Sequence, residues 1–163
     1  MHFTENHLWV FSSALYAKPH IADCFLQLQD RYKANVNVLL WSIWLERQQV
    51  RLTSDRLAAA LELIQQWDVD YVQVLRELRR KIKSRLDFAQ NLGFIVSVRE
   101  KIKQAELLAE KQEQEWLEQV AQDWSWESVQ LKEGENLGLY LHFLNIPQMF
   151  IEEVKAIVNN HEN

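Results

Sequence analysis

Residues 36–49 read VNVLLWSIWLERQQ, and this stretch decides the fold. Its apolar side chains recur at helical intervals and cover most of the circumference of a helix, at Val36, Leu39, Leu40, Ile43 and Trp44. A helix that is apolar on nearly all sides is buried by other elements. The sequence therefore predicts a central helix over residues 36–49 with further helices packed around it.

Amphipathic patterns on both sides of this stretch predict the surrounding helices. Pro19 suits the first turn of one of them, because a missing N–H costs nothing there. Thr53 or Ser54 suits the N-cap of another, since a hydroxyl accepts the free N–H groups of the first turn. These helices span residues 7–17, 19–32, 53–66, 137–144 and 147–158, with a loop at 123–136. The expected fold is all-α, a compact bundle of about seven or eight helices.

A long helical hairpin is the most distinctive prediction, with its two helices at residues 68–85 and 95–121. Asp68 or Asp70 suits the N-cap of the first helix. The apolar pattern fades around Asn91 and Gly93, which indicates the turn between the helices. A second helix of about 25 residues spans roughly 37 Å, longer than many small domains are wide. We expect one domain over residues 1–163, with the hairpin of residues 68–121 extending past its body.

The sequence also indicates in which cellular compartment the protein is expected. Cys24 is the single cysteine of the 163 residues, so no internal disulfide forms. The longest apolar run, residues 36–45, is far shorter than the roughly 20 residues that cross a membrane. The sequence opens with no secretory-signal pattern. We therefore expect a cytoplasmic protein without membrane contact.

Several short motifs resemble those of an uncharacterised bacterial family of small helical proteins, a domain of unknown function. In the first half these motifs are Asn6-His7-Leu8-Trp9, Phe11-Ser12, Ala14-Leu15-Tyr16-Ala17, Leu28-Gln29-Asp30, Ala34-Asn35-Val36-Asn37-Val38-Leu39-Leu40 and Trp44-Leu45. In the middle section they are Leu75-Arg76-x-Leu-Arg79-Arg80 and Lys103-x-Ala105-Glu106. The resemblance covers most of residues 6–120. It implies a bacterial, cytoplasmic, helical protein and no particular reaction.

Positive charge gathers on the predicted hairpin, where residues 76–103 hold nine cations against three anions in a chain of net charge −5. Four of the cations recur at i, i+3, i+4 and i+7 on one helical face, and a second pair lies four residues apart on the facing helix. A groove between them suits phosphate or carboxylate. The alternative is that these cations pair with Glu106 or Glu110 on a solvated face. The candidate ligand- or partner-binding residues are Arg76, Arg79, Arg80, Lys83, Arg99, Lys103 and Glu106.

Two smaller groups complete the candidate sites. Asn35 and Asn37 flank the start of the central helix, where an amide either caps the helix or orients a ligand. Trp124 and Trp126, in a polar stretch, are candidates for a surface interaction patch. The sequence contains no His-Glu-x-x-His or paired Glu-x-x-His motif. We therefore expect no metal, no cofactor and no catalytic residue.

Two functions remain open. The favoured hypothesis is a non-enzymatic protein-interaction or adaptor protein of the bacterial cytoplasm, with a protein partner or self-association. The alternative is a small-molecule binder or an enzyme that acts on a phosphate- or carboxylate-bearing ligand through the basic helix face. Nucleic acid is a less favoured partner, because the rest of the chain is strongly acidic and no nucleic-acid-binding motif occurs.

Overall fold

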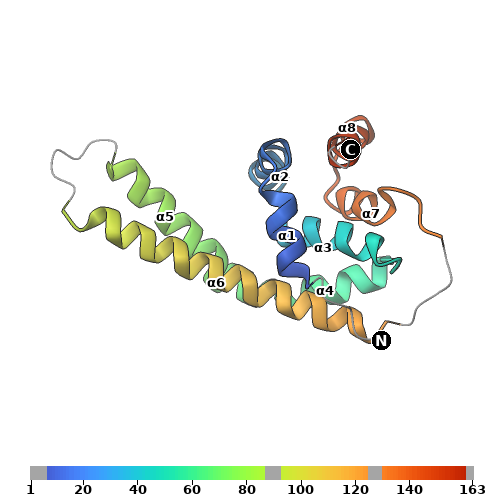
Figure 1. Ribbon diagram of the computed structural model, residues 1–163, viewed down its shortest axis with the longest axis horizontal. Helices are drawn as coiled ribbons and strands as arrows, with labels where there is room; N and C mark the ends of the chain where they lie inside the picture. Colours follow the sequence, from blue (N-terminus) through green and yellow to red (C-terminus); the bar gives the residue numbers. More distant parts are fainter. Residues whose placement is uncertain (1–6, 87–92, 125–129, 161–163) are drawn as a thin grey trace.

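The computed structural model describes residues 7–86, 93–124 and 130–160, and the regular structure in these residues is entirely helical. Figure 1 shows a body of short helices at one end and a two-helix arm that leaves it at the other. The predicted all-α fold, with its long helical hairpin, is confirmed. None of the helices described is long and apolar enough to cross a membrane.

Helix α3, Val36–Arg47, lies at the centre of the body, as its sequence predicts. Trp41 and Trp44 on this helix have no exposed surface. The helix packs against α1, α2, α6 and α7, which together bury its apolar circumference. Asn35 caps it, because its side-chain oxygen accepts hydrogen bonds from the N–H groups of Asn37 and Val38. The core of the protein is thus built around the stretch that decides the fold.

Helices α1, Leu8–Tyr16, and α2, Pro19–Tyr32, cover one side of α3. Pro19 occupies the first position of α2, and Lys33 ends the helix with φ at 57°. On the other side lie α7, Glu135–Phe143, and α8, Gln148–Asn159. The start of α7 is fixed by Glu46, whose carboxylate accepts the backbone N–H groups of Gly134 and Asn136 at 2.6 and 3.0 Å. These four helices follow the predicted boundaries to within two residues.

The predicted break before the hairpin is wrong. Helix α4, Ser54–Trp67, has Thr53 as its N-cap, but it continues directly into η1, a π-helical segment over Asp68–Val72. This segment in turn continues into α5, Gln73–Leu86. Asp68 therefore caps no new helix. A π-helix forms its hydrogen bonds one residue further along the chain than an α-helix, and such segments are frequent at functional sites.

The arm consists of α5 and the first half of α6, Ile95–Gln122. Figure 1 shows these two helices side by side, projecting from the body. No residue of α5 is fully buried, whereas α6 buries residues only from Glu106 onward. The second half of α6 thus belongs to the body, and the first half extends past it.

Candidate functional site

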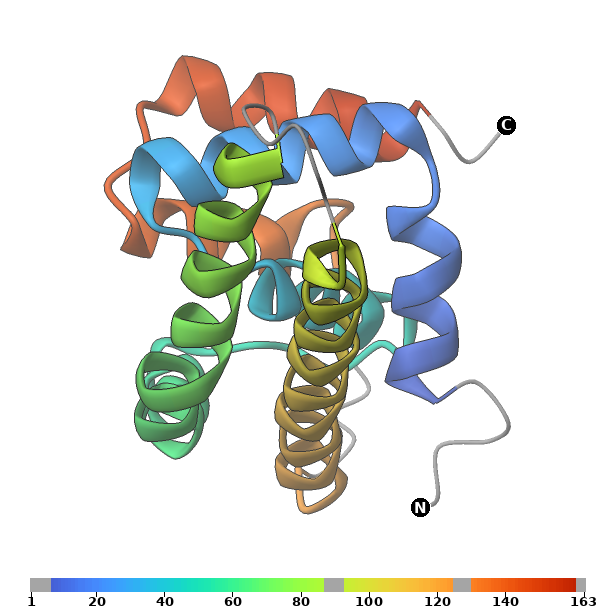
Figure 2. The ribbon, with the colours of Figure 1, turned by 90° about the vertical axis from the view of Figure 1, so that its left-hand side faces the viewer.

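A cleft of about 440 Å³ lies where the arm meets the body, with side chains of α1, α2, α3, α5 and α6 in its walls. In the view along the arm, α5 and α6 lie in front, α2 lies above them, α1 lies to the right, and α3 lies behind (Figure 2). Its volume is in the range of small-molecule sites. Apolar side chains form much of the lining, among them Trp9, Leu26, Val36, Leu40 and Leu107.

Five of the seven predicted binding residues line this cleft. They are Arg76, Arg79, Arg80, Lys103 and Glu106. Lys83 and Arg99 do not line it, although both lie on the arm. The helical spacing of the cations therefore predicts that they lie on one face of the arm. It does not predict which of them are close enough to the body to line the cleft.

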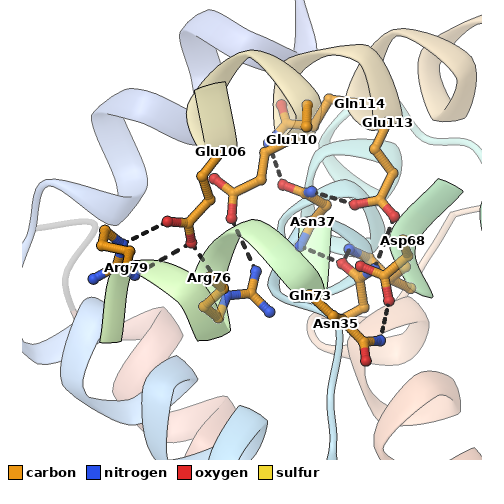
Figure 3. Close-up of polar contacts among 12 residues, drawn as sticks. Asn35, Asn37, Asp68, Gln73, Arg76, Arg79, Glu106, Glu110, Glu113 and Gln114 are labelled. Atoms are coloured by element: carbon orange, nitrogen blue, oxygen red, sulfur yellow. Dashed lines mark hydrogen bonds and ion pairs between the residues drawn. The ribbon is translucent and has the colours of Figure 1, made fainter. Parts of the chain in front are cut away.

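Glu106 holds two of the arginines in place across the hairpin. Its carboxylate accepts two hydrogen bonds from Arg79, at 2.5 and 3.2 Å, and lies 3.3 Å from Nε of Arg76. Arg76 also donates to Glu110 at 3.0 Å. Figure 3 shows this network along one face of α6. These two arginines are consequently fixed, as the alternative interpretation of the charge pattern expects.

The remaining two cations are less constrained. Arg80 forms an ion pair with Asp30 at 3.2 Å, and the side chains of both are half exposed. Lys103 is exposed and forms no ion pair within the described part of the chain. The lining contains four cations and the carboxylates of Glu106 and Glu110, and Asp30 pairs with Arg80. One positive charge, that of Lys103, is therefore in excess, which favours anions at the mouth of the cleft.

At the inner end of the cleft, the lining residues Asn37 and Gln114 belong to a network of amides around Glu113, a fully buried carboxylate that does not itself line the cleft. Asn35 and Asn37 donate from their Nδ2 atoms to the two oxygens of Glu113, at 3.2 and 2.5 Å. Gln114 in turn donates to Oδ1 of Asn37 at 2.9 Å. The two asparagines thus serve both the start of α3 and this network (Figure 3). Sequence reasoning identified the asparagines but missed Glu113 and Gln114, although Glu106, Glu110 and Glu113 share the face of α6 that also carries Ala109 and Leu117.

The pKa of Glu113 is raised to about 7, mainly by burial and to a smaller extent by the nearby charge of Asp68. The two amide hydrogen bonds oppose this shift, because they stabilise the charged form. Burial also raises the pKa of Asp68 and of Glu110, while Arg76 opposes the shift in both. Behind the inner wall of the cleft, burial thus favours the protonated form of the Glu113 carboxyl group.

We expect the stability of the protein to fall as the pH rises from about 4.5 to 7. Glu113 has an ordinary pKa of 4.5 and a folded-state pKa of about 7, so folding takes up a proton in this window. The difference corresponds to about 3 kcal/mol of unfolding free energy. Urea unfolding at a series of pH values measures it. The unfolding free energy of Glu113→Gln should fall less steeply with pH than that of wild type. Glu115→Gln, an exposed control on the same helix, should show the wild-type pH dependence. Equal slopes for wild type and Glu113→Gln would contradict the assignment.

The predicted tryptophan patch is only partly within the described residues. Trp124 is half buried, with its ring 5.6 Å from that of Trp41 and the Arg56 guanidinium 4.9 Å from its ring centroid. Trp126 lies outside the described residues. Trp124 therefore packs on the core at the end of α6.

No cluster of three or more His, Cys, Asp or Glu side chains in the described ranges is arranged to hold a metal ion. The acidic side chains of the cleft instead bind arginines and amides. Burial raises the pKa of the Cys24 thiol, which lies outside this cleft, to about 11. This thiol is therefore protonated at neutral pH and unsuited to nucleophilic attack.

Comparison with known proteins places the chain in a family but gives it no function. No curated protein and no solved structure matches it. A family model described as a protein of unknown function (DUF2390) matches residues 7–117. The matched part is more than half of the chain and contains every residue that lines the cleft. The resemblance seen in the sequence is thus confirmed, and the chain belongs to the DUF2390 family of proteins of unknown function.

Proposed function

We propose that this protein binds a small anionic ligand, bearing a carboxylate or a phosphate, in the basic cleft. The observation that carries the proposal is the cluster of four cations in the lining, of which Lys103 has no acidic partner within the described residues. Largely apolar walls around a few charged groups are typical of small-molecule sites. The fixed arginines contribute preorganised charge. Arg80 can exchange its half-exposed partner Asp30 for a ligand, and Lys103 is free to close on one.

Charge reversal at the mouth tests this proposal. The double variant Arg80→Glu, Lys103→Glu should weaken the binding of phenyl phosphate and benzoate at least tenfold, because charge-assisted hydrogen bonds are lost and repulsion replaces them. Ligand-induced shifts in melting temperature and calorimetric titration both measure the effect.

The matched control is Lys81→Glu, Lys101→Glu, which makes the same change of charge on the same two helices outside the cleft. It should bind both probes as wild type does. If the two double variants lose affinity equally, the attraction comes from the overall field of the arm and not from the cleft. If wild type shows no binding to either probe, the proposal is wrong.

A second candidate function is the protein interaction that the sequence favours. Its support is a set of exposed apolar side chains on the arm, with Phe94 86% exposed and Leu108 69% exposed. Val98 and Ile102 of α6 and Leu75 of α5 line an apolar groove near Phe94. Exposed apolar surface of this kind is typical of protein contacts. Concentration-dependent sedimentation that Val98→Asn abolishes would support self-association through this groove.

A further inference from the structure

We propose that the ligand of the basic cleft is a long-chain acid: a carboxylate on an apolar chain of about a dozen carbons, with a hydroxyl group at the far end. This inference rests on the anion-binding function proposed above. It follows from the way in which charge, apolar surface and unpaired polar atoms are distributed along the cleft.

Lys103, the lining cation without an acidic partner in the described residues, and the neutral amide of Gln114 lie at opposite ends of the site, with the paired Arg76 and Glu110 between them. Lys103 and Gln114 both line the cleft from α6 and are eleven residues apart. At 1.5 Å per residue this separation is about 16 Å. Figure 3 shows the same order along the helix, with Glu106 and Arg79 at one end and Gln114 and Asn37 at the other. A ligand that fills the cleft is therefore elongated, with its acidic group near Lys103 and Arg80.

Apolar side chains form much of the remaining lining. Leu107 on α6, Leu26 on α2 and Leu40 on α3 line the cleft, together with Trp9 on α1. An inorganic anion or a short acid would leave this surface in contact with water. Each buried methylene group raises affinity about fourfold. A chain advancing about 1.2 Å per bond needs roughly a dozen carbons to reach the inner end.

Two buried polar atoms at the cleft wall have no partner. Ser12 Oγ and Gln114 Oε1 form no hydrogen bond within the described structure, and each of these residues is only 3% exposed. The Gln114 amide is held by its bond to Asn37, which fixes the direction of its free oxygen. Buried polar groups without partners are rare in native proteins. A hydroxyl on the ligand can donate to Gln114 Oε1 or accept from Ser12 Oγ.

Calorimetric titration of the full chain with four probes tests the inference. The probes are dodecanoate, 12-hydroxydodecanoate, dodecanol and hexanoate, each kept below its aggregation concentration. We expect 12-hydroxydodecanoate to bind about tenfold more tightly than dodecanoate, because its hydroxyl satisfies an unpaired oxygen. Hexanoate should bind at least a hundredfold more weakly than dodecanoate. Dodecanol, which lacks the acid, should bind more weakly than either long acid.

Variants locate the effect within the cleft. Ser12→Ala and Gln114→Met should reduce the preference for the hydroxylated acid while retaining affinity for dodecanoate. Val98→Asn, in the apolar groove of the arm, should leave all four affinities unchanged. Loss of dodecanoate binding in Val98→Asn would place the chain on the arm and overturn the inference.

The remaining outcomes separate this inference from the function on which it rests. Equal affinity for the two long acids, or for hexanoate and dodecanoate, overturns the inference. Phenyl phosphate and benzoate then decide the function: if they bind and the mouth variant loses them, anion binding stands without the long chain. If none of the anions binds, both proposals fail together.

Discussion

Replacing Glu106 with alanine should lower the free energy of unfolding by about 3 kcal/mol. The Glu106 side chain is only 7% exposed and pairs with Arg79 and Arg76, which are 23% and 17% exposed. Without the carboxylate, two mostly buried guanidinium groups lose their principal acceptor. Breaking such a pair costs more than the pair itself contributes, because the remaining charge is left without a partner. Urea unfolding followed by circular dichroism measures the loss.

Glu100→Ala is the matched control, since Glu100 is exposed on the same helix and should change stability by no more than about 0.5 kcal/mol. Adding Arg79→Leu to Glu106→Ala should recover part of the loss, because one of the stranded charges is removed as well. If Glu106→Ala costs no more than Glu100→Ala, the arginines find other partners and the network does not fix the arm.

Truncation of Trp41 should be still more destabilising. Trp41 has no exposed surface and packs against Trp124 at the end of α6. Trp41→Ala leaves a large cavity at the centre of the body, and such changes cost about 3–5 kcal/mol. Thermal and urea unfolding of the two proteins give the difference.

Trp41→Phe provides the comparison for this cavity. The indole Nε1 is buried without a hydrogen-bond partner in the described structure, so its removal sacrifices no hydrogen bond. Phenylalanine should therefore retain well over half of the stability that alanine loses. A loss for Trp41→Phe as large as that for Trp41→Ala would indicate that the indole nitrogen has a partner such as an ordered water.

The helices could be predicted from the sequence because their signals are local. Apolar periodicity around Leu39 and Ile43, the proline at position 19 and the hydroxyl of Thr53 act within a few residues of themselves. The exception is Asp68, which resembles an N-cap in sequence but lies inside a continuous helix. At this position the packing of η1 against α6 outweighs the preference of aspartate for a helix N-cap.

The candidate site was predictable only in part, for the same reason. The cations and Glu106 recur at helical spacing, so their shared face is visible in the sequence. The Glu113 network joins residues more than seventy positions apart in the sequence. No local pattern predicts that Asn35 and Asn37 bind a side chain of α6. The signal that was available is a third carboxylate, Glu113, on the apolar face of α6. A carboxylate on such a face needs partners from elsewhere in the fold.

The π-helical segment makes the site depend on how the backbone is wound as well as on its side chains. A π-helical turn accommodates an additional residue within an otherwise regular helix, so the helix after it keeps its direction. If residues 68–72 were wound as a regular α-helix, the additional residue would rotate everything after it by about 100° relative to α4, and Arg76 and Arg79 would turn away from Glu106. Deletion of one residue within Asp68–Val72, by contrast, should give an unbroken α-helix in which both arginines still face Glu106. The wider turn thus sets which side of the arm faces the body.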